Sequence, residues 1–149
     1  MTRISVLFML LSLGASALAS GPNIHSQRPQ DTSNAKYASD LVGADKSDRL
    51  YAAQVLLRRV KTAWKTSVKE GDSIQVLEAR QALSEFDQSV APRCLRMLST
   101  ANTAKPCIRI LGMLETKAAL EPLRQQLDSA GLCRRRLLTT AIRQIEGTQ

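Results

Sequence analysis

One apolar pattern recurs four times along the chain and limits the folds that it can adopt. It spans eight positions and is apolar at positions 1, 4, 5 and 8, so that all four side chains share one face of a helix. The copies comprise Ala53, Leu56, Leu57 and Val60; Ala79, Ala82, Leu83 and Phe86; Cys107, Ile110, Leu111 and Leu114; and Leu138, Ala141, Ile142 and Ile145. Because the copies start 26, 28 and 31 residues apart, they predict a domain of repeated helical units.

A shorter apolar helix is expected before each copy. These helices fall near residues 35–42, 63–68, 90–98 and 120–127. The helix near 63–68 is either separate or a direct continuation of the preceding one. No segment alternates β-branched residues, so strands have no support. The predicted fold class is all-α, as a short right-handed α-solenoid of about four stacked antiparallel helix hairpins, with an irregular helical bundle as the alternative.

The start of the chain has the pattern of a cleavable secretory signal. Arg3 precedes an apolar run over residues 4–13, and Ala17-Leu18-Ala19 matches the cleavage consensus. The run is shorter than the roughly 20 residues of a spanning helix. The expected organisation is a signal peptide (1–19), a polar leader (20–34), a repeat domain (35–146) and a tail (147–149). We therefore expect an exported protein without a transmembrane helix in the mature chain, periplasmic in a Gram-negative bacterium and secreted otherwise.

A helix start is predicted after Gly71. Asp72 has a side chain suited to an N-cap, and Gln75 stands three residues later, as in a capping box. This pattern predicts that Asp72 caps the helix that carries the second copy of the template.

Three cysteines, Cys94, Cys107 and Cys133, are the only thiols. In an oxidising compartment any two of them can pair in a disulfide; the alternative is that each is a small buried apolar residue. Their spacing fits no zinc motif, and the sole histidine, His25, lies in the leader. We therefore predict no metal site, no cofactor and no histidine-based catalytic pair, and expect a protein that is not an enzyme.

Basic residues outnumber acidic ones and give a formal net charge of +8. This balance favours acidic partners. The predicted anion or partner contacts are Arg58, Arg59, Arg93, Arg96, Arg134, Arg135 and Arg136. The positions after the apolar pair of each copy (58–59, 84–85, 112–113 and 143–144) are not all basic, so no continuous basic stripe is expected. Nucleic acid is disfavoured because the chain has few aromatic side chains for base stacking.

Several segments resemble short HEAT-type repeats of the compact form named after phycobilisome lyases. They are Leu95–Leu98 with Cys107–Leu114, then Ala118–Leu127, and Tyr37–Val42 with Arg49–Leu57. The resemblance covers about residues 35 to 146. It implies an extended surface that binds proteins. In a few members of the family this surface binds nucleic acid or assists a chromophore-lyase reaction.

These expectations lead to one main function and two alternatives. The main hypothesis is an exported, non-catalytic protein-interaction or scaffold module with an unidentified protein partner. The first alternative is a basic binder of anionic envelope polymers or lipid head groups. The second is a lyase-associated accessory protein.

Overall fold

The computed structural model describes residues 33–147. The predicted signal peptide (1–19) and most of the predicted leader (20–34) lie outside the described residues. Helices make up 77% of the described part, which contains no strand, so the predicted all-α class is confirmed. None of these helices is long and apolar enough to cross a membrane.

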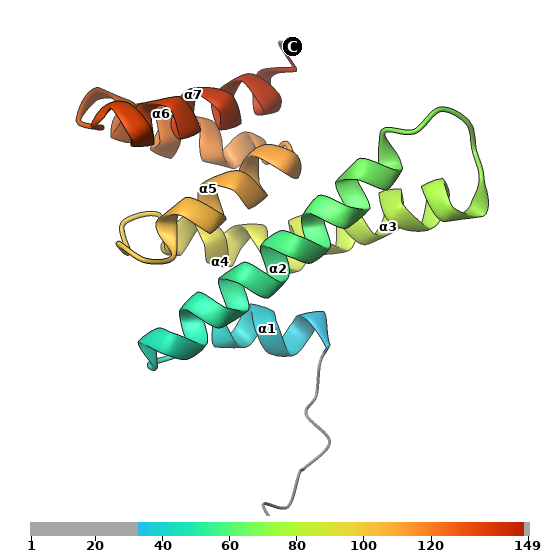
Figure 1. Cartoon of the computed structure of the whole chain (residues 1–149), viewed down its shortest axis with the longest axis horizontal. Helices are drawn as coiled ribbons and strands as arrows, with labels where there is room; N and C mark the ends of the chain where they lie inside the picture. Colours follow the sequence, from blue (N-terminus) through green and yellow to red (C-terminus); the bar gives the residue numbers. More distant parts are fainter. Residues whose placement is uncertain (1–32, 148–149) are drawn as a thin grey trace, which may run out of the picture. The chain divides into compact units, whose positions relative to one another are not determined.

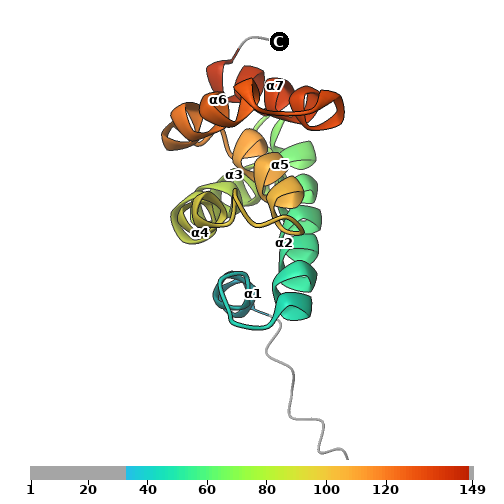
Figure 2. The ribbon, with the colours of Figure 1, turned by 90° about the vertical axis from the view of Figure 1, so that its left-hand side faces the viewer.

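Seven α-helices and one short 3₁₀ helix follow one another along the described chain. They are α1 (Asn34–Asp40), α2 (Lys46–Ser67), α3 (Ile74–Ser89), α4 (Ala91–Arg96), α5 (Ala104–Met113), η1 (Lys117–Ala119), α6 (Leu120–Asp128) and α7 (Leu132–Glu146). α1 packs on α2, α4 on α5, and α6 on α7. The second helices of these pairs, α2, α5 and α7, also pack on one another in chain order and form one layer (Figures 1 and 2).

α2 continues without a break through the segment near residues 63–68. Ala63 and Trp64 therefore lie inside α2, which confirms the continuation that the sequence left open. The second copy of the template lies in α3, which packs along α2. α3 then gives way at Val90 to α4, where Pro92 occupies the first turn. The described residues thus form three helix pairs, extended by α3, where the spacing predicts about four hairpins.

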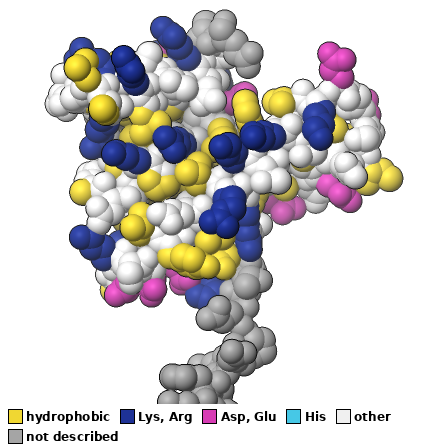
Figure 3. Space-filling view, in the orientation of Figure 1, with side chains coloured by type: hydrophobic (Ala, Val, Ile, Leu, Met, Phe, Trp, Pro, Cys, Tyr) yellow, Lys and Arg dark blue, Asp and Glu magenta, His cyan; other side chains and the backbone are white. Residues whose placement is uncertain are grey.

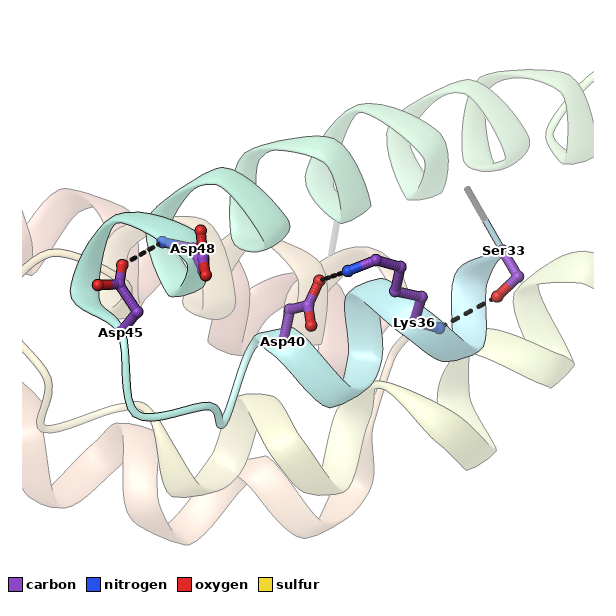
Figure 4. Close-up of polar contacts among 5 residues, drawn as sticks. All are labelled: Ser33, Lys36, Asp40, Asp45 and Asp48. Carbon is purple, nitrogen blue, oxygen red and sulfur yellow. Dashed lines mark hydrogen bonds and ion pairs between the residues drawn. The ribbon is translucent and has the colours of Figure 1, made fainter. Parts of the chain in front are cut away.

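Side-chain caps fix the starts of α1 and α2 (Figure 4). Ser33 Oγ accepts a hydrogen bond from the Lys36 backbone N–H at 3.2 Å. Asp45 Oδ1 accepts one from the Asp48 backbone N–H at 3.0 Å. Each bond satisfies a donor that lacks an intrahelical partner. Lys36 Nζ also lies 2.6 Å from Asp40 Oδ2, one turn further along α1.

The cap of α3 is one residue later than predicted. Ser73, not Asp72, is the N-cap: its backbone is extended (φ −61°, ψ 151°) and its Oγ accepts a hydrogen bond from the Val76 N–H at 3.4 Å. Asp72 instead pairs with Arg80 Nη1 at 3.2 Å. The prediction of an Asp72 cap was wrong because both residue types can cap and only the backbone decides between them.

The apolar template faces the core, as its period predicts. Its fully buried members include Leu56, Leu111, Leu138 and Ile145, while Leu57 and Leu114 are half-buried. Burial of one such large aliphatic side chain contributes about 1.5–3 kcal/mol. The four copies therefore join α2, α3, α5 and α7 in one continuous core.

Candidate functional site

A groove of about 580 Å³ crosses the layer formed by α2, α5 and α7. All three helices contribute side chains to it. The lining residues are Leu57 and Lys61 from α2; Arg109 and Met113 from α5; and Cys133, Arg136, Leu137, Thr140, Ala141 and Gln144 from α7. We call this feature the α2–α5–α7 groove.

Cationic side chains surround the groove. Lys61, Arg109 and Arg136 are exposed, one on each of the three helices. No Asp or Glu belongs to the lining, and within residues 33–147 none of these three cations forms an ion pair. Figure 3 shows Lys and Arg side chains gathered around apolar ones on this face. Cations of one sign around a hollow attract anionic groups into it.

The floor of the groove is apolar. Leu57, Met113 and Leu137 are half-buried and leave part of their side chains exposed to the groove. The unbranched thioether of Met113 can adapt to ligands of different shape. An apolar floor with a few polar groups at its edge is the usual composition of a ligand site. The groove therefore suits a ligand that carries both apolar and anionic groups.

Only one of the seven predicted arginine contacts, Arg136, lines the groove. Arg58 is exposed at a second depression, between α2 and α3, whose lining also contains Glu78. Arg96 and Arg135 are exposed elsewhere on the described surface. The seven arginines are thus distributed over several faces.

The other three predicted arginines are engaged within the fold. Arg59 Nη1 donates to Asn34 Oδ1 at 2.6 Å, and its guanidinium lies 4.9 Å from the centre of the Tyr37 ring. Arg93 donates to the Ser89 carbonyl. The structure therefore gives these two side chains a stabilising role.

Arg134 joins three elements at the start of α7. Its Nη2 donates to the Leu98 carbonyl at 3.0 Å and to Gln126 Oε1 at 2.6 Å. Positive charge is unfavourable in the first turn of a helix. Here the Nη2 group is bonded to two acceptors, one from α6 and one from the segment after α4, which tie the guanidinium into the fold.

Sequence reasoning missed Lys61 and Arg109 as members of one site. Lys61 follows the last apolar position of its template copy, Arg109 lies inside its copy, and Arg136 precedes its copy. The three cations therefore occupy different template positions, and equivalent positions in the four copies do not reveal them as one set. Neighbouring helices cross at an angle and are displaced along their axes (Figure 1), so different template positions meet.

The structure places two of the three cysteines together. Cys94 of α4 and Cys107 of α5 are fully buried with their thiols close enough to interact, whereas Cys133 is exposed in the groove. The hydrogen bond to Cys107 and burial raise the pKa of the Cys94 thiol well above its usual range. All three are free thiols in the structure. Among the described residues, no group of three or more His, Cys, Asp or Glu could hold a metal ion.

The HEAT-type resemblance predicts that the chain is similar to known HEAT-type proteins. No protein-family model, curated protein or solved structure matches this chain. Membership of a HEAT-type family therefore stays a prediction, and the groove has to be interpreted from its own geometry.

Proposed function

We propose that the chain is an exported, non-catalytic interaction module whose α2–α5–α7 groove binds a segment of a protein partner. That segment carries both carboxylates and apolar side chains. The observation that supports this proposal is the set of three cations, Lys61, Arg109 and Arg136, around an apolar floor and without a carboxylate in the lining.

The scaffold supports a binding role. Each wall of the groove is a helix held by the common core, so the backbone positions from which the binding side chains project are set before a partner arrives. The three helix pairs, with their second helices in one layer, fit the proposal of a short HEAT-like solenoid. Such arrays bind partners through the surface that successive repeats form together.

A protein segment fits the groove better than the alternative ligands do. A bilayer surface cannot enter a hollow between helices, and a polysaccharide or polyphosphate chain has no apolar groups for Leu57, Met113 and Leu137. A polyanion would instead respond to exposed arginines over the whole surface, including Arg135 outside the groove. The two ideas therefore differ in which arginines matter.

The test uses a fluorescent synthetic helical peptide of Glu and Leu as the probe. Arg109→Glu and Arg135→Glu change the net charge equally at two exposed positions, but only Arg109 lines the groove. We expect Arg109→Glu to raise the Kd about tenfold or more, which corresponds to about 1.4 kcal/mol, and Arg135→Glu to change it little. A peptide of Gln and Leu should bind more weakly than the acidic peptide.

A different set of results would favour the alternative function, in which the net positive charge binds anionic polymers or lipid head groups. Equal losses for the two variants, together with binding of heparin or phosphatidylglycerol vesicles that disappears with added salt, would indicate a general polyanion binder. Failure of the acidic peptide to bind at low salt would overturn the groove as a site for acidic segments.

A further inference from the structure

The corner between α2 and α3 carries exposed apolar side chains. Val68, Ile74 and Leu77 are 60%, 75% and 50% exposed. Exposed apolar groups that gather in one place, rather than singly, often mark a binding surface. We call residues 68–78 the α2–α3 corner. It projects away from α7 (Figure 1). Val68 borders a depression that the end of α5 also lines, whereas Ile74 and Leu77 keep at least half of their surface exposed.

Acidic residues lie among these apolar side chains. Glu70, Asp72 and Glu78 are all exposed. Asp72 is paired with Arg80 at 3.2 Å, so Glu70 and Glu78 are the two carboxylates of the corner without an ion pair to any described residue, against one basic residue, Lys69. Figure 3 shows acidic and apolar side chains together at this end of the molecule. The corner thus combines carboxylates with apolar side chains. This is the combination that the basic and apolar α2–α5–α7 groove is suited to bind.

We infer that two copies of this chain associate, with the α2–α3 corner of each copy in the α2–α5–α7 groove of the other. Ile74 and Leu77 cover the apolar floor, and the corner carboxylates face the cations of the groove. This inference rests on the proposed function of the groove and identifies one partner as a second copy. Closed two-fold pairing forms both contacts at once, because each copy supplies one corner and one groove.

A chain cannot fill its own groove in this way. Lys61 lines the groove and belongs to the same unbroken helix as Ser67, at which α2 ends. At 1.5 Å per residue the end of α2 lies roughly 9 Å further along the helix axis. α3 then packs back along α2, which holds the corner away from the groove of its own chain.

Light scattering after size-exclusion chromatography tests the inference on the full chain. The wild type should have the mass of two chains. A variant with both Ile74→Ser and Leu77→Ser should have the mass of one chain, and so should Arg109→Glu. Both changes affect exposed side chains, so the fold should remain intact by circular dichroism. Leu132→Ser is the matched control, because Leu132 is 82% exposed and does not line the groove, and it should leave the mass unchanged.

Mixing the two monomeric variants gives the sharper result. The corner variant keeps an intact groove and Arg109→Glu keeps an intact corner. The mixture should therefore form a one-to-one complex through one corner–groove contact. A monomeric wild type, a dimer that survives both variants, or a mixture without complex would each overturn the inference. The Glu–Leu peptide is then added to the corner variant, whose groove is free. If the peptide binds to this groove and the wild type is monomeric, the proposed function stands and only the self-association is wrong. If the peptide does not bind, the proposed function itself is contradicted.

Discussion

Gly112 of α5 lies directly against Ala141 of α7. A Cβ atom on Gly112 would stand 3.0 Å from the Cα atom of Ala141 and 2.6 Å from Oε1 of Gln144. The absence of a side chain at Gly112 therefore lets α5 and α7 approach closely. Ala141 and Gln144 also line the α2–α5–α7 groove, so this contact and the shape of the groove depend on each other.

We expect Gly112→Leu to destabilise the protein by about 2 kcal/mol or more, because the new side chain has no room between the helices. Urea unfolding followed by circular dichroism measures the change. Gly131→Leu is the control, since no atom beyond its chain neighbours lies within 4 Å of a Cβ at that glycine; it should cost only the loss of a glycine N-cap of α7. Equal losses in the two variants would show that the packing of Gly112 on Ala141 is not the cause.

Glu115 occupies a backbone conformation that favours glycine. Its φ is +54°, and it ends α5 in a motif where the Glu115 N–H donates to the Gly112 carbonyl and the Thr116 N–H to the Leu111 carbonyl. Glu115→Gly should raise the free energy of unfolding by about 0.5–1 kcal/mol, because glycine adopts this conformation without steric cost. Glu121→Gly, in the first turn of α6, should instead lower it, because glycine is a poor helix former and the favourable negative charge at the helix N-terminus is lost. A loss of stability in Glu115→Gly would contradict this reading of the motif.

The period of the apolar template was predictable from sequence, and so was the core that it forms. Leu56, Leu111 and Leu138 are buried because an amphipathic helix has one arrangement that removes its apolar face from water. Helix ends were less predictable. Ser73 caps α3 in place of Asp72 because either side chain can accept the same hydrogen bond.

The groove could not be predicted from the same information. Arg109 and Arg136 come together because α5 and α7 pack at a particular displacement along their axes. That displacement depends on side-chain volumes across the contact, including the close approach at Gly112. A repeat template specifies which face is buried but does not specify which neighbours meet.

The raised pKa of Cys94 makes stability depend on pH in the reduced protein. In the folded state the interaction with Cys107 and burial raise the pKa of this thiol and keep it protonated, while in the unfolded chain it ionises at an ordinary thiol pKa of about 8.5. The unfolded state then binds fewer protons, so the free energy of unfolding falls as pH rises above that value, by up to about 1 kcal/mol per pH unit. Urea unfolding from pH 7 to 10 should therefore show a steeper fall for the wild type than for Cys94→Ala, which cannot ionise there. Parallel curves for the two proteins would contradict the prediction.

The contact between Cys94 and Cys107 selects one of the three disulfide pairings that the sequence allows. If the chain is exported, as its first 19 residues predict, these two thiols meet an oxidising compartment while already side by side. Secreted protein, unfolded without reductant and titrated with a thiol reagent, should then contain one free thiol per chain, and peptide mapping should assign it to Cys133. Cys133→Ser should reduce the count to zero. A count of three would show that no disulfide forms, and a bridge that includes Cys133, the one exposed cysteine, would contradict the predicted pairing.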